Sequence, residues 1–267
     1  MGSEPRRSGL VWLTILSLAA LIVLVGLGTW QLQRRAWKED LIARIKARAV
    51  EAPVTLADPR VAAVARRGQP VGQGLAAEAL AIWQAAQTPE FLRVRVQGAF
   101  APRRDLFYYA PDPRRGPGWQ VVSPFRLADG RVVLVNRGYV SEAERRGPPA
   151  AWAAPGGTLE ITGRLRSPGH RAMFEPVNNV TANQWYWRDL PAMAREVLDG
   201  QAAATTVVPF FLELEASPQA SARIPQPLPA RVDLPNNHLQ YALTWFGLAL
   251  TLLGVWGAYL WQAVRRR

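Results

Sequence analysis

The sequence predicts an α+β membrane protein: two transmembrane helices, one near each end of the chain, flank a mainly antiparallel β domain with a few helices. Residues 10–27 and 239–261 are apolar runs of 18 residues or more, and each is long enough to cross a hydrocarbon core of about 30 Å as a helix. The intervening 200 or so residues have ordinary soluble composition and contain several strand-like patterns. We therefore expect one domain held at a membrane by both of its ends.

Composition narrows the classes of function. Of the 267 residues, 49% are hydrophobic and 9% are aromatic, which is enough to fold and excludes a disordered spacer; the length favours one core over two small ones. The net charge is +12, but the basic residues crowd the flanks of the apolar runs, so anionic membrane lipid is expected as a partner and nucleic acid is not. The absence of cysteine excludes disulfides, thiolate metal sites, c-type heme attachment and a copper carrier of the paired-cysteine kind.

Basic residues also suggest the topology. The first apolar run is longer than a usual signal-peptide core and no small-residue cleavage site follows it, so it is interpreted as a retained anchor. Arg6 and Arg7, together with Arg265–Arg267, predict that both termini are cytoplasmic, although residues 34–48 are also basic. The expected division is a cytoplasmic N-terminus (1–9), a transmembrane helix (10–29), a periplasmic β-rich domain (30–235), a transmembrane helix (236–261) and a basic cytoplasmic tail (262–267).

Between the apolar runs, the periodicity predicts elements in a definite order. The first helix continues from Gly28 to about residue 49, before Pro53, and an alanine-rich segment (58–87) ends in a short helix at 75–86. Alanine, aspartate and glycine at 128–130 predict a hairpin turn, and Asp189 is a candidate N-cap for a helix reaching residue 198. A proline-rich segment, 218–235, leads back to the membrane. The predicted strands are 91–100, 105–110, 118–127, 131–140, 157–165, 184–188 and 207–215.

His238 is one of two histidines and the one adjacent to an apolar run. If Asn236 or Asn237 caps the second helix, His238 lies in the first turn at the outer membrane surface, with Tyr241, Ala242 and Trp245 on the same face. Imidazole is a common axial ligand of heme iron, aromatic rings can stack against a porphyrin, and alanine leaves room for one. The alternative is an interfacial histidine that only anchors the helix end.

Three further motifs allow a structural and a functional interpretation. Residues 28–38, which include Trp30, Gln31 and Arg34, lie where the first helix leaves the membrane, either as an ordinary interfacial belt or as a surface that completes a site near His238. Arg137, beside Gly138 at a strand end, is either structural or a partner for a propionate or helix end. In the second apolar run, small residues at spacings of three and four suit close helix packing, within the chain or against another membrane protein: Gly247, Thr251, Gly254 and Ala258.

Catalysis is not predicted. The sequence has no paired-histidine metal motif, nucleophile elbow or phosphate loop, and two histidines supply little acid-base chemistry. Glu213 and Glu215 share one face of a predicted strand, which a solvated face explains. We therefore do not expect an enzyme.

Several segments together resemble the Surfeit locus protein one family of cytochrome c oxidase assembly factors, over nearly the whole chain. The matching residues are Gly28, Trp30, Gln31, Arg34, Trp37 and Lys38; Val135-Asn136-Arg137-Gly138; residues 183–189; and Asn236 to Tyr241 with Thr244-Trp245-Phe246. Tyr139 departs from the family's frequent tryptophan, and residues 58–87 look expanded. The resemblance implies maturation of the heme-copper oxidase, with bacterial members binding heme a and passing it toward the catalytic subunit, and it maps the family's histidine onto His238.

Together these observations predict a bacterial inner-membrane assembly factor that binds heme a transiently, with His238 on the iron. In this hypothesis Tyr241 and Trp245 wall the macrocycle, Trp30, Gln31 and Arg34 complete or dock the site, and Arg34 or Arg137 pairs with propionates. The expected partners are the oxidase catalytic subunit and heme a synthesis or other assembly factors. The alternative is a membrane scaffold that stabilises an oxidase intermediate without binding heme.

Overall fold

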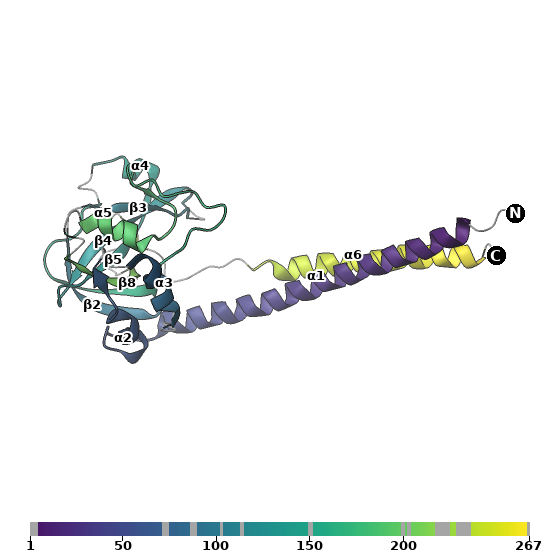
Figure 1. The fold of residues 1–267 in the computed structure, drawn as a ribbon, viewed down its shortest axis with the longest axis horizontal. Coiled ribbons are helices and arrows are strands. Elements are labelled where there is room, and N and C mark those ends of the chain that lie inside the picture. The colour runs from purple at the N-terminus through teal and green to yellow at the C-terminus, as the bar shows by residue number, and fades with distance from the viewer. Residues whose placement is uncertain are drawn as a thin grey trace. The chain divides into compact units, whose positions relative to one another are not determined.

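The computed structural model describes residues 5–70, 75–85, 90–101, 104–112, 115–148, 152–198, 201, 204–216, 225–227 and 236–265. The chain forms two compact units (Figure 1). One consists of Met1–Arg44 with Asp233–Arg267 and is a helical hairpin; the other, Ile45–Val232, is a β-rich domain. The predicted fold class, two terminal apolar helices flanking a mainly antiparallel domain, is confirmed.

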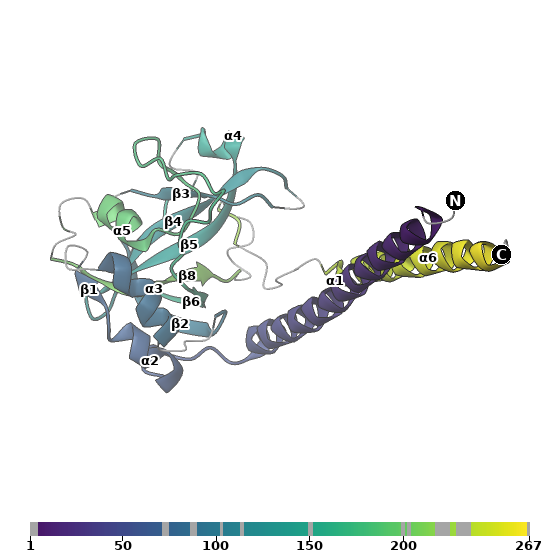
Figure 2. The same cartoon turned by 45° about the vertical axis from the view of Figure 1, so that its right-hand side comes forward.

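The hairpin is built from α1 (Pro5–Val50) and α6 (His238–Arg265), which run side by side in opposite directions (Figures 1 and 2). Both are long and apolar enough to cross a membrane, judged by length and composition. With 46 residues at about 1.5 Å each, α1 is about 69 Å long, so it continues well past its apolar part, as the spacing of residues 28–49 predicts. Pro53 follows shortly after its end.

The two helices meet along a seam with spacings of three and four residues, typical of coiled-coil packing. On α6 the less exposed positions include Ala242, Trp245, Ala249 and Leu252, and on α1 they include Leu21, Leu24, Gly28 and Gln31. Small residues allow the backbones to approach closely: a β-carbon on Gly28 would lie 2.6 Å from Cε1 of Phe246. Farther along, Trp256 Nε1 donates to Thr14 Oγ1 at 3.4 Å.

The small-residue stripe of α6 lies outside this seam. Among the described residues, a β-carbon on Gly247 or Gly254 would meet no atom within 4 Å, and Thr251 and Ala258 are exposed. Of the two packing roles that the sequence allowed, packing within this hairpin is therefore excluded.

The β domain follows the predicted order of elements. Its helices are α2 (Pro59–Ala65), α3 (Leu75–Ala85), α4 (Glu142–Arg145) and α5 (Leu190–Leu198). Its strands are β1 (Gln69–Pro70), β2 (Arg93–Phe100), β3 (Leu106–Tyr109), β4 (Gly118–Leu127), β5 (Val132–Ser141), β6 (Leu159–Arg166), β7 (Gln184–Trp185) and β8 (Thr206–Leu214).

Five strands close into a barrel. β4 pairs with β2 and β5, β8 pairs with β5 and β6, and β2 pairs with β6, so the ring runs β2-β4-β5-β8-β6 and back to β2. The β5–β8 and β3–β7 pairs are parallel, and the other strand pairs are antiparallel. The hairpin turn predicted at 128–130 is confirmed, because it joins the antiparallel strands β4 and β5. Along β5, Val133 and Val135 join one core cluster while Val132 and Leu134 join a second, which contains α5. Both faces of β5 are therefore buried.

Two short helices were missed by the sequence reasoning, although each begins with a recognisable cap. At α2, Asp58 accepts a hydrogen bond from the backbone N–H of Arg60 at 2.9 Å, and Pro59 occupies the first helical position. At α4, Ser141 and Glu144 form a capping box. The predicted N-cap of α5 is confirmed, because Asp189 Oδ1 accepts from the backbone N–H of Ala192 at 3.1 Å.

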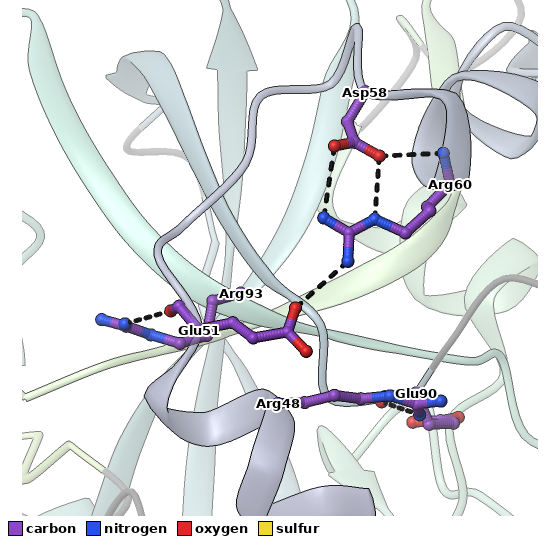
Figure 3. A network of polar contacts seen from close by, with 6 residues as sticks. All are labelled: Arg48, Glu51, Asp58, Arg60, Glu90 and Arg93. Atoms are coloured by element: carbon purple, nitrogen blue, oxygen red, sulfur yellow. Dashed lines mark hydrogen bonds and ion pairs between the residues drawn. The ribbon is translucent and has the colours of Figure 1, made fainter.

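The last residues of α1 belong to the β domain. Ile45 is buried, and Arg48 donates to the backbone carbonyl of Glu90 at 2.9 Å (Figure 3). Glu51 lies just beyond the helix. Its backbone carbonyl accepts from Arg93 at 2.7 Å, and its carboxylate accepts from Arg60 at 3.1 Å. This network ties the end of α1 and the segment after it to β2 and α2.

Candidate functional site

His238 is the first residue of α6. The backbone carbonyl of Asn237 accepts from the N–H of Tyr241 at 3.3 Å, so Asn237 stands at the N-cap position and His238 lies in the first turn, as predicted. The side chain of His238 is half-buried rather than fully exposed. The helix start therefore holds an imidazole at the edge of the hairpin seam, at the end of the apolar run.

Gln31 of α1 meets this imidazole. Its Oε1 atom lies 2.7 Å from Nδ1 of His238, although the two residues are 207 positions apart in the chain. An amide oxygen can only accept a hydrogen bond, so in this arrangement Nδ1 carries the proton. Among the described residues Gln31 is the one polar partner of His238, and Nε2 remains available as an electron-pair donor.

The other predicted residues of α6 lie around this pair in different ways. Ala242, one turn after His238, is buried in the seam, and Trp245 is half-buried. Tyr241 is 56% exposed and lies on the flank of the helix. Ala242 and Trp245 therefore lie on the face of α6 that meets α1, whereas Tyr241 lies beside that face; their role as walls of a flat ligand stays a prediction.

On α1, Trp30 and Arg34 lie outside the seam. Trp30 is 53% exposed, and the Arg34 guanidinium stacks over the ring of Trp37 at 4.0 Å from its centroid. Among the predicted site residues of α1, Gln31 alone forms a hydrogen bond with His238 in the described part of the chain. Trp30 and Arg34 form an exposed aromatic and cationic border at the same level of the helix.

Arg137 lies in the β domain, where its side chain is 6% exposed and engaged with protein groups. Its guanidinium lies 3.6 Å from the Asp105 carboxylate, donates to the carbonyl of Ala153 at 3.1 Å and faces the ring of Phe100. Burial lowers the pKa of Arg137, opposed by the Asp105 carboxylate. Burial also raises the pKa of Asp105, opposed by the hydrogen bond from Ser123 and by the Arg137 charge. The contacts favour the structural interpretation of Arg137.

The neighbours of Arg137 have structural roles as well. Gly138 has φ of +127°, and a β-carbon there would lie 2.1 Å from the carbonyl oxygen of Gln226. Gln226 and Tyr139 exchange backbone hydrogen bonds of 2.8 and 2.9 Å, which fasten residues 225–227 to β5. Asn136 accepts from the N–H of Gly138 at 3.1 Å. This motif therefore clamps part of the segment that leads toward α6.

Residues 183–189 also support the fold. Asn183, at φ of +52°, donates to the carbonyl of Asp105 at 2.8 Å and accepts from the indole of the fully buried Trp185 at 3.0 Å. These contacts hold β7 against β3. Asp105 and Gln226 are the partners of the 183–189 motif and of the Gly138 motif, respectively. No pattern in the sequence pointed to either residue.

The carboxylates of Glu213, on β8, and Glu215, just after it, are not the solvated face that we expected. Glu213 is 8% exposed and forms an ion pair with Arg166 at 2.5 Å. Glu215 forms a bidentate ion pair with Arg93 at 2.8 Å. Charges buried this far require such partners. Among the described residues, no group of three or more histidine, cysteine, aspartate or glutamate side chains could hold a metal ion.

Fold and site together define a β-barrel domain carried by two long apolar helices, with one histidine presented at the end of the helical hairpin. Residues 18–250 match the model of the SURF1 family. A SURF1-like protein of Monosiga brevicollis is 30% identical over 95% of this chain and 88% of its own length. The Surfeit locus protein 1 of Mus musculus and of Homo sapiens are each 32% identical, over 90% and 88% of this chain and 72% of their own lengths. The chain belongs to the SURF1 family.

Proposed function

We propose that this protein is an assembly factor for heme-copper cytochrome c oxidase that binds heme a through His238 and delivers it to the catalytic subunit. The observation that carries the proposal is the half-buried imidazole at the start of α6, whose Nδ1 is engaged by Gln31 and whose Nε2 has no hydrogen-bond partner among the described residues. Family membership supports the assembly role.

The residues present fit a heme. A neutral imidazole is a usual axial donor, and the half-buried Trp245 and the exposed Tyr241 supply aromatic surface on the same helix. When bound, the heme would contribute only its own redox-active iron; this chain would hold it, shield it from water and release it. Arg34 is proposed to pair with a propionate, because its guanidinium is exposed on the same stretch of α1 as Gln31. No catalytic turnover is required of the protein.

In this proposal α1 and α6 cross a bacterial inner membrane, with both termini in the cytoplasm and the β domain in the periplasm. The lengths and apolar character of the two helices support the crossing, and the arginines near the two termini support the direction. Heme a synthesis enzymes or other assembly factors are the proposed sources of the cofactor.

The test is purification of the chain from cells that make heme a, in mild detergent, followed by an absorption spectrum and extraction of the bound heme. We expect the wild type to show a Soret band. His238→Ala should weaken this band and lower the heme affinity by at least about tenfold, because an axial ligand is lost. His170→Ala is the matched control, since His170 is the second histidine and is exposed in a loop. A colourless wild type, or equal loss in both variants, would contradict the proposal.

The outward small-residue stripe of α6 favours a second candidate function, a scaffold that binds a helix of an oxidase subunit without binding heme. Gly247, Thr251, Gly254 and Ala258 are exposed and lie away from α1, which leaves them open to another membrane helix. Gly254→Leu should then impair oxidase assembly while the purified hairpin stays intact. Val255→Leu, at an exposed neighbouring position off the stripe, is the control.

A further inference from the structure

The contact between Gln31 and His238 selects one of two forms of the imidazole. A neutral imidazole carries its single proton on Nδ1 or on Nε2, and the hydrogen bond made by one nitrogen decides the form. Here the 2.7 Å contact joins Nδ1 to the amide oxygen of Gln31, which has no proton to give. With the amide oxygen facing the ring, Nδ1 is the nitrogen that carries the proton.

From this geometry we infer that Gln31 is a positioning residue that fixes His238 as the Nδ1-protonated tautomer and directs its Nε2 lone pair at the ligand. The inference rests on the proposed function, since it concerns the same site, and it specifies how the chain prepares the donor atom before a heme arrives. Without Gln31, both tautomers and several ring orientations become available to His238.

The packing of the hairpin explains why Gln31 can do this. Gln31 is half-buried and follows Gly28 by one turn, while the buried Ala242 follows His238 by one turn. Both small residues bring the helices close enough for two medium-length side chains to meet directly, and Gly28 receives the ring of Phe246. A hydrogen bond between half-buried side chains also meets less competition from water than a hydrogen bond between exposed ones.

The consequence for ligand binding follows from the same bond. A partner that accepts the proton of the non-ligating nitrogen orients the ring and raises the basicity of the ligating nitrogen, and loss of such a partner typically lowers metal affinity by about 10- to 100-fold. We therefore expect Gln31→Leu to weaken heme binding by at least about tenfold. Gln31→Glu keeps an acceptor at this position, so it should retain binding and lower the reduction potential of the bound heme.

The decisive experiment does not need heme. The full chain, labelled with ¹⁵N-histidine and purified in detergent, is examined by NMR at about pH 8.5, about two units above the ordinary histidine pKa of about 6.5. The chain has two histidines, so a His170→Asn variant assigns both signals. We expect the His238 shifts to report a proton on Nδ1 in the wild type and in Gln31→Glu, and a mixture of tautomers in Gln31→Leu.

The matched control is Gln33→Leu, which makes the same change on an exposed position of α1 two residues away. It should leave the His238 shifts and heme affinity unchanged. A wild-type proton on Nε2 would mean that Gln31 presents its NH₂ group, and it would overturn the inference. So would wild-type shifts in Gln31→Leu.

Titration of the same samples with heme a separates this inference from the proposed function. A proton on Nδ1 that depends on Gln31, without any heme binding, would overturn the proposed function and leave the positioning role standing. Heme binding that is lost in His238→Ala but unaffected by Gln31→Leu would uphold the function and overturn the positioning role.

Discussion

The helical hairpin and the β domain each hold a polar pair of residues distant in sequence, and the two pairs differ in what they leave available. In the domain, the Arg137 guanidinium is divided among Asp105, the Ala153 carbonyl and the ring of Phe100. In the hairpin, Gln31 engages one nitrogen of His238, and the other has no partner in the part of the chain that the structure describes. The Arg137 motif thus serves the fold, whereas the His238 motif carries the proposed ligand atom.

The largest expected effect is the loss of the domain pair. Arg137→Met should lower the free energy of unfolding of the β domain by about 3–5 kcal/mol, because it leaves the half-buried Asp105 carboxylate without its cation and the Ala153 carbonyl without its donor. Urea unfolding of the full chain in detergent, followed by tryptophan fluorescence, measures it. Arg95→Met is the control, since Arg95 is 48% exposed and pairs with Glu160 at 3.6 Å, a kind of contact that contributes about 1 kcal/mol at most.

This variant also sharpens the contrast between the regions. The His238 tautomer should be the same in Arg137→Met as in the wild type under conditions where the domain remains folded. If heme affinity falls instead while stability is unchanged, Arg137 is a propionate partner and the comparison fails.

The next effect concerns the clamp at β5. Gly138→Ala should destabilise the domain by about 2–3 kcal/mol, because it combines an unfavourable positive φ with a β-carbon directed at Gln226. Gly130→Ala is the matched control: Gly130 has φ of +86° but open space around it, so only the backbone strain of about 1 kcal/mol is expected. Equal losses of unfolding free energy in the two variants would show that a β-carbon at position 138 does not clash with Gln226. Urea unfolding again provides the measurement.

The smallest expected effect tests the hairpin. Gly28→Leu should cost about 1–2 kcal/mol of helix packing, because the new side chain meets the ring of Phe246. Gly26→Leu is the control, as a β-carbon on Gly26 would meet nothing within 4 Å among the described residues. Because the chain lacks cysteine, spin labels on cysteines introduced at the exposed Gln33 and Gln240 report the helix separation. We expect longer, broader distances in Gly28→Leu alone.

Much of the fold could be predicted because its signals are local. The apolar runs predicted both long helices, and alternation predicted the strands to within a few residues, as at 118–127, where β4 has the predicted bounds. The short helices α2 and α4 were missed because helices of seven and four residues are too short to show a helical periodicity. The ion pairs of Glu213 and Glu215 were missed because their partners come from β2 and β6.

By itself, the sequence determined most of the elements, the two apolar helices and the placement of His238 at a helix start, because periodicity and caps act over a few neighbouring residues. Only the tertiary structure decided which residues meet across the chain. The parallel β5–β8 pair closes the barrel, Gln226 fits against Gly138, and the bulk of Phe246 over Gly28 sets the face of α6 that meets α1. Gln31 therefore reaches His238 across 207 positions, a pairing that depends on helix packing and leaves no periodic trace in the sequence.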